Sequence, residues 1–140
     1  MKIINQATEE VIREVAEDTE TTISKKFSLL QTGQPHWSAI PLQKRIACIE
    51  KFYALLDEQK EELANTLTSE MGKPIQQSYN ELNGARNRIK FFIDNSSKWL
   101  SEEWITTEGA NKEKISYEPL GVIANISAWN YPYLVGVNVF

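Results

Sequence analysis

The chain has 140 residues, and its 15 basic and 19 acidic side chains give a formal net charge of −4 with the one histidine neutral. This length allows one domain or part of a larger one, and 41% apolar with 24% charged residues is an ordinary globular composition. The acidic balance argues against a nucleic-acid partner, because binding a phosphate backbone needs clustered cationic side chains.

Membrane and secretory classes are also disfavoured by the sequence. No apolar run approaches the roughly 20 residues that span a bilayer, and the first ten residues carry acids where a secretion signal needs an apolar stretch. Cys48 is the one cysteine, so no internal disulfide can form. We therefore expect a cytoplasmic protein with no membrane partner.

The first predicted element is a β-hairpin over residues 2–16. Apolar and polar side chains alternate over residues 11–15, and polar residues 5–10 connect this run to an apolar pair at 3–4. Alternation of this kind is typical of paired strands that expose one face.

A helix is expected next, beginning near Asp18 and Thr19, whose side chains can accept hydrogen bonds from backbone N–H groups. Gly33 and Pro35 predict its end. Its predicted buried face consists of apolar residues at helical spacing, namely Ile23, Phe27 and Leu30.

Three more apolar stripes predict three further helices, of which the first begins at Pro41, the second ends at Gly72 and the third begins at Pro74. The stripes are Leu42, Ile46, Ile49, Tyr53 and Leu56, then Leu63, Leu67 and Met71, then Ile75, Tyr79, Leu82, Ile89, Phe92 and Ile93. Additional apolar residues widen the first stripe, which predicts packing on more than one side and a buried Cys48. Gly84 would kink the third helix or allow close packing.

The character of the chain changes after residue 100. Polar residues 101–114 predict an exposed connection or hairpin turn, and residues 115–117 alternate as in a half-exposed strand. Residues 121–126 are almost continuously apolar, which predicts a strand covered on both faces, and Pro132 predicts the start of a helix. A strand followed by a helix begins a βαβ unit, which requires a second parallel strand.

The predicted fold class is therefore α/β. Residues 1–118 form an N-terminal helical layer with a short β-hairpin. Residues 119–140 form the first strand and helix start of an incomplete Rossmann-like cofactor domain. We expect the apolar residues 135–140 to be uncovered.

The candidate site is residues 126–130, at the carboxyl end of the predicted strand, where open α/β sheets bind nucleotides. The side-chain amide of Asn130 could donate two hydrogen bonds to an oxygen that gains negative charge in a reaction. A structural interpretation is also open, in which Trp129 and Tyr131 are packing residues and Asn130 caps a helix.

Several short motifs follow one another along the chain. They are Asn5-Gln6-Ala7-Thr8, Glu10-Val11-Ile12, Trp37-Ser38, Glu70-Met71-Gly72-Lys73-Pro74, Pro119-Leu120-Gly121-Val122 and Trp129-Asn130-Tyr131-Pro132. In this order the chain resembles the N-terminal portion of the NAD(P)-dependent aldehyde dehydrogenase superfamily. Gln6 and Glu9 stand where that family usually has Pro and Gly, so this turn lacks a residue with a fixed φ and a residue that adopts a positive φ freely.

The resemblance implies a reaction and a set of roles. In that family a cysteine thiolate adds to an aldehyde, hydride passes to the nicotinamide of NAD or NADP, and a glutamate activates water to release the carboxylate. By resemblance Asn130 is the side-chain donor to the oxyanion. The residues implied to lie along the cofactor are Ile126, Ser127, Ala128 and Trp129.

The family's nucleophile and general base lie downstream of these motifs, so the resemblance implies a fragment that is inactive alone. Its implied partners are a small-molecule aldehyde, a homo-oligomer formed through a strand region near residues 112–118, and a complementing C-terminal polypeptide. Cys48 lies in an apolar arc far upstream and is interpreted as an inert thiol. His36 has no second ligand at metal-binding spacing, so no metal site is predicted. The alternative hypothesis is a non-catalytic interaction module built on helices between residues 19 and 100.

Overall fold

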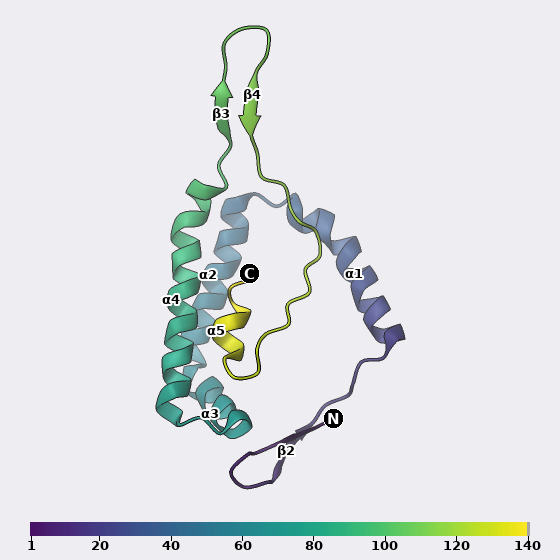
Figure 1. Ribbon diagram of the computed structural model, residues 1–140, viewed down its shortest axis with the longest axis vertical. Helices are drawn as coiled ribbons and strands as arrows, with labels where there is room; N and C mark the ends of the chain where they lie inside the picture. The colour runs from purple at the N-terminus through teal and green to yellow at the C-terminus, as the bar shows by residue number, and fades with distance from the viewer. Residues whose placement is uncertain (140) are drawn as a thin grey trace.

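The computed structural model describes residues 1–139, and Phe140 lies outside the described residues. Helices α2, α3 and α4 pack beside the short α5, α1 stands apart from them, and the β3–β4 hairpin projects beyond the ends of α2 and α4 (Figure 1). The elements in chain order are β1 (Lys2–Ile4), β2 (Val11–Glu14), α1 (Glu20–Ser38), α2 (Leu42–Glu58), α3 (Lys60–Met71), α4 (Ile75–Trp99), β3 (Glu103–Thr106), β4 (Glu113–Ile115) and α5 (Pro132–Gly136).

The apolar core lies among α2, α3, α4 and the residues around α5. Four of its members belong to the predicted stripes, namely Leu56, Leu67, Leu82 and Ile89. The others are Ala64 and Ala85, which lie on α3 and α4, and Val137, which lies one residue beyond α5. Leu82 has no exposed surface. The predicted starts near Pro41 and Pro74 are confirmed, because α2 and α4 begin one residue after each proline.

Two glycines shape this helical layer, one at the end of a helix and one in the middle of another. Gly72 terminates α3 with φ +70°, a left-handed conformation that glycine adopts without a Cβ clash, and its N–H donates to the Thr68 carbonyl at 2.9 Å. Helix α4 runs without interruption through Gly84, where an added Cβ would lie 3.6 Å from Leu134 Cδ1. Of the two predicted roles, close packing is therefore the one that the structure shows.

Helix α1 corrects two predictions. It continues through Pro35 for three more residues to Ser38, and in this last turn the Ser38 hydroxyl and the Ala39 N–H donate to the Pro35 carbonyl at 2.9 and 3.1 Å. The predicted buried face is exposed: Ile23, Phe27 and Leu30 are each about half accessible. Within residues 1–139, residues 121–123 approach α1 near Leu30 and leave that face largely open to solvent.

Cys48 also departs from its prediction, because it is exposed. The wide apolar arc of α2 is covered only where α3 and α4 pack against it, so Leu56 is 6% exposed while Leu55 on another side is 47% exposed. The wide apolar arc of α2 therefore does not mean that other elements cover the helix on every side.

The predicted covered strand over residues 121–126 is not formed in this chain. The segment is extended, none of the described residues pairs with its backbone, and Ile123 and Ile126 are 51% and 92% exposed. A strand needs a hydrogen-bonded neighbour, and an apolar sequence cannot supply one by itself. The prediction of an uncovered end is wrong for Val137, which is 4% exposed against the core, whereas Val139 is 45% exposed.

The N-terminal hairpin is confirmed, with β1 and β2 paired antiparallel. Its connecting turn is held by the Asn5 carboxamide oxygen, which accepts hydrogen bonds from the N–H groups of Ala7 and Thr8 at 2.8 and 3.3 Å. Glu9 in the same turn has φ +60°, which is uncommon for a residue with a side chain. The turn therefore adopts the glycine-type conformation although glycine is absent.

Replacing Glu9 by glycine is expected to stabilise this hairpin by about 1 kcal/mol, because glycine adopts a positive φ without steric cost. Amide hydrogen exchange of the paired residues in β1 and β2 should slow by about fivefold in the Glu9→Gly variant. Glu9→Ala, which keeps the Cβ, is the matched control and should leave exchange nearly unchanged. Equal effects of the two substitutions would show that the backbone at Glu9 is not strained.

Candidate functional site

The segment that contains the predicted site folds back on α5. The Ser127 hydroxyl donates to the Pro132 carbonyl at 2.7 Å, and the Asn125 side-chain amide donates to the Gly136 carbonyl at 3.0 Å. These two bonds close a loop over residues 125–136, with Asn130 in the turn that precedes α5. The position of Asn130 is thus tied to that of α5.

Two polar side chains of this loop bind α5, whereas its large apolar side chains face solvent. Asn125 and Ser127 bind α5 through their polar atoms, whereas Ile126 and Trp129 are 92% and 74% exposed. Ile126 and Trp129 therefore present most of their surface to solvent, and the cofactor role of residues 126–129 stays a prediction. Sequence reasoning did not foresee the bond from Ser127 to Pro132.

The structural interpretation of the motif is wrong for two of its three residues. Trp129 is largely exposed and does not pack in the core. Tyr131, not Asn130, is the N-cap residue of α5, and α5 has no side-chain cap bond at that position. Asn130 is exposed, and within residues 1–139 no hydrogen bond holds its side-chain amide. Its two amide hydrogens are therefore available to a ligand.

A buried carboxylate of α4 holds the first turn of α5. The Glu81 side chain is 0% exposed, and its Oε1 accepts hydrogen bonds from the N–H groups of Tyr133 and Leu134 at 2.9 and 3.3 Å. These N–H groups have no partner inside the helix, so the carboxylate satisfies them and its negative charge lies at the positive end of α5.

Lys73 supplies the countercharge. Its Nζ donates to Glu81 Oε2 at 2.5 Å, and its side chain is 11% exposed. The same ammonium lies 3.7 Å from the centroid of the Tyr131 ring. Lys73 therefore contacts both the carboxylate below α5 and the residue that follows Asn130.

Sequence reasoning missed both members of this ion pair. Lys73 belongs to a motif that was singled out, but no contact could be assigned to it from the sequence. Glu81 carries a detectable signal, because it occupies the same helical stripe as the buried residues Ser78, Ala85 and Ile89. An acid inside an apolar stripe indicates a buried charge that requires a partner.

Tyr133 anchors α5 from its other side. Its hydroxyl donates to the Leu63 carbonyl of α3 at 3.3 Å. Burial, together with the nearby carboxylates of Glu70 and Glu81, raises the pKa of the Tyr133 phenol above its usual value of about 10. The neutral phenol is thus the form that the folded chain favours.

The raised pKa of Tyr133 predicts a loss of stability in alkali. Its contribution is complete below about pH 10 and declines as the pH rises toward the higher pKa of the folded state, because the unfolded chain loses the phenolic proton first. Urea unfolding at a series of pH values should show a shallower alkaline decline for Tyr133→Phe than for the unsubstituted chain. Tyr117→Phe, at a 58% exposed tyrosine, is the control and should keep the steeper decline.

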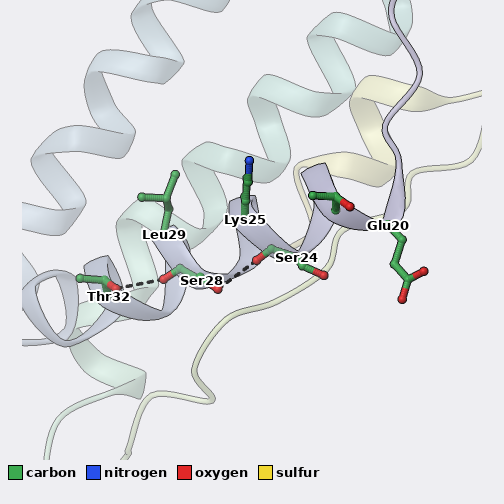
Figure 2. Close-up of a pocket in the computed structure, with 7 residues that line it drawn as sticks. Glu20, Ser24, Lys25, Ser28, Leu29 and Thr32 are labelled. Atoms are coloured by element: carbon green, nitrogen blue, oxygen red, sulfur yellow. Dashed lines mark hydrogen bonds between the residues drawn. The ribbon is translucent and has the colours of Figure 1, made fainter.

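A large surface hollow lies elsewhere and lacks the features of an active site. Figure 2 shows that one helix, α1, provides its walls, and that the hydroxyls of Ser28 and Thr32 bond to carbonyls of their own helix. The hollow is shallow and open to solvent, and it is lined by Glu20, Thr21, Ser24, Lys25, Ser28, Leu29 and Thr32. Among the described residues, no second element brings a reactive group to it, so it is not the candidate site.

Two further properties describe the rest of the molecule. In the part of the chain that the structure describes, no three His, Cys, Asp or Glu side chains gather as metal ligands would. None of the helices within residues 1–139 combines the length and the apolar character needed to cross a bilayer.

Comparison with known proteins identifies a family. Residues 1–139 match the Aldehyde dehydrogenase family. A curated relative, the probable succinate-semialdehyde dehydrogenase (NADP+) of Synechocystis sp., is 30% identical over 130 residues, which cover 93% of this chain and 28% of the relative. The chain thus spans less than a third of the length of this relative.

Solved structures agree with the sequence comparison. Glyceraldehyde-3-phosphate dehydrogenase of Methanocaldococcus jannaschii, complexed with NADP, superposes with a TM-score of 0.90 at 23% identity over 98% of this chain and 30% of its own. A putative methylmalonate-semialdehyde dehydrogenase of Sinorhizobium meliloti, complexed with NAD, superposes with a TM-score of 0.88 at 28% identity. The match covers 98% of this chain and 28% of that enzyme. The fold of the chain is therefore that of one part of these larger enzymes.

Proposed function

Because the chain belongs to the aldehyde dehydrogenase family, we propose that it is the N-terminal part of an enzyme that oxidises an aldehyde to a carboxylate with NAD or NADP. The observation that carries this proposal is the accessible, unbonded amide of Asn130, fixed next to α5 in a chain that matches the family along residues 1–139.

Asn130 is proposed to act as a hydrogen-bond donor to the oxygen that becomes negative when a nucleophile adds to the aldehyde. An amide suits this role because it donates without ionising and because a fixed donor needs no reorganisation during the reaction. Its exposure and lack of competing bonds within residues 1–139 support the assignment.

Residues 126–129 are proposed to lie along the cofactor, which accepts hydride when bound. The side chains of Ile126, Ala128 and Trp129 carry no charged group that could bind a phosphate. Ile126 and Trp129 offer exposed apolar surface, and Ala128 offers a methyl group. Their contribution would come from packing and backbone groups. The Ser127 hydroxyl is already donated to Pro132, so it holds the loop in place.

The remaining chemistry is proposed to come from other parts of the enzyme. Cys48 is exposed on α2 and has no proposed role, so we expect the 140 residues alone to be inactive. Residues 119–140 are proposed to begin the cofactor domain, whose further strands would cover residues 121–126. The exposed β3–β4 hairpin and residues 112–118 are proposed to contribute to a homo-oligomer.

A chimera tests the proposal directly. Residues 1–139 would replace the matching segment of the Synechocystis relative, and NADPH formation from succinate semialdehyde would be followed by absorbance. We expect activity from the chimera, and none from this chain alone or from the relative without the segment. A chimera that is folded by circular dichroism but inactive would contradict the proposal and favour a non-catalytic helical interaction module.

A further inference from the structure

We propose that Lys73 and Glu81 are positioning residues for Asn130, an inference that rests on the proposed function. Two separate motifs meet at this point, because Lys73 follows Gly72 in the loop between α3 and α4, and Asn130 precedes α5. The pair fixes the residues immediately after Asn130 and thereby sets the direction of its amide.

The contacts fall on the carboxyl side of Asn130 in close succession. The Lys73 ammonium lies over the ring of Tyr131, and the Glu81 carboxylate binds the N–H groups of Tyr133 and Leu134. On the other side of Asn130, the Ser127 hydroxyl binds the Pro132 carbonyl. The backbone that carries Asn130 is therefore restrained from both directions.

Lys73 neutralises the buried charge of Glu81. Glu81 Oε2 accepts a hydrogen bond from Lys73 and Oε1 accepts hydrogen bonds from α5, so both oxygens have partners, and the side chain is fully buried. Without the ammonium, an uncompensated buried charge would remain beside α5, and the carboxylate would move toward water or take up a proton. The first change would release the Tyr133 and Leu134 N–H groups, and the second would leave them bound to a neutral and therefore weaker acceptor.

Apart from the bond from Ser127 to Pro132, the other anchors of α5 do not reach the turn that holds Asn130. Tyr133 binds Leu63 through its distal hydroxyl, and Val137 is buried one residue beyond α5. These contacts keep α5 on the helical layer even when the ion pair is lost. Lys73 joins that layer to Tyr131, so its loss should disturb the turn more than the fold.

Hydrogen exchange on the unsubstituted 140-residue chain and its variants tests the restraint. In Lys73→Met, exchange of the Tyr133 and Leu134 amides should accelerate about tenfold or more, while amides in the middle of α4 should accelerate no more than the loss of overall stability requires. Lys73→Arg should restore protection, since it keeps the charge and the contact with the ring. Lys90→Met, which removes an exposed ion pair with Asp94, is the matched control and should change neither region.

Kinetics in the chimera test the positioning role. We expect Lys73→Met to lower kcat by about tenfold to a hundredfold with the KM for the aldehyde changed little, because a small displacement of a catalytic group affects the transition state most. Tyr131→Leu, at a 44% exposed position, removes only the ring contact and is expected to lower kcat in the same direction without unfolding the chain. Lys90→Met should keep the kcat of the parent.

The outcomes separate the two proposals. Unchanged exchange at Tyr133 and Leu134 in Lys73→Met would overturn the restraint, whatever the activity of the chimera. Faster exchange with unchanged kcat would overturn the positioning role and leave the proposed function standing. An inactive parent chimera would overturn the proposed function and the catalytic part of this inference, while the exchange data would still decide the restraint.

Discussion

Replacing Asn130 by alanine in the active chimera is expected to lower kcat by about 100- to 1,000-fold, the usual effect of removing one side-chain donor to an oxyanion. The KM for the aldehyde should change much less, because the negative charge that the amide stabilises is present in the transition state and not in the bound aldehyde. Steady-state NADPH formation measures both constants.

Two matched variants make this result specific. Asn130→Asp keeps the size of the side chain but replaces the amide donors with a carboxylate, and it should reduce kcat at least as strongly. Asn65→Ala, at an exposed position on α3, should leave kcat near that of the parent. Because Asn130 makes no hydrogen bond within residues 1–139, its removal should not lower the unfolding midpoint. If kcat of Asn130→Ala stays within about threefold of the parent value, Asn130 is not a donor to the oxyanion.

Lys73→Met is expected to lower the free energy of unfolding of the chain by about 3 kcal/mol, because removing one member of a buried ion pair leaves the other charge uncompensated. Both side chains are well shielded from water, with 11% and 0% of Lys73 and Glu81 exposed, so solvent screening reduces the effect little. Urea denaturation followed by circular dichroism measures it.

Coupling between the two residues provides the internal check. Glu81→Gln removes the buried charge and keeps an oxygen that can accept from Tyr133, so adding it to Lys73→Met should recover part of the lost stability. Lys114→Met breaks an ion pair with Glu102 that is 40% and 53% exposed, and should cost less than about 1 kcal/mol. Strictly additive losses at Lys73 and Glu81 would show that the two charges do not stabilise each other.

Local signals along the chain were sufficient to predict most of the elements. Alternation at residues 11–15, prolines at 41, 74 and 132, and Gly72 each act through the backbone of their own segment, and the structure confirms the hairpin and the helix ends that they predict. Rules of this kind transfer well because the physical cause lies within a few residues of its effect.

Coverage of a surface could not be predicted in the same way. Ile23 on α1, Cys48 on α2 and Ile126 before α5 all lie in apolar stretches, yet each is exposed in the structure. An apolar stripe shows which side of a segment favours burial, but burial also requires a second segment to pack against it. Residues 1–139 supply such a segment for α2, α3 and α4 only in part.

The sequence by itself determined the family, through motifs in a fixed order, and it singled out Asn130 as the candidate donor. Only the tertiary structure decided how Asn130 is held, because Lys73 and Glu81 meet the α5 region across separations of 50 residues or more that no local pattern records. A buried charge must find its partner in space, and that pairing exists only once the helices have packed.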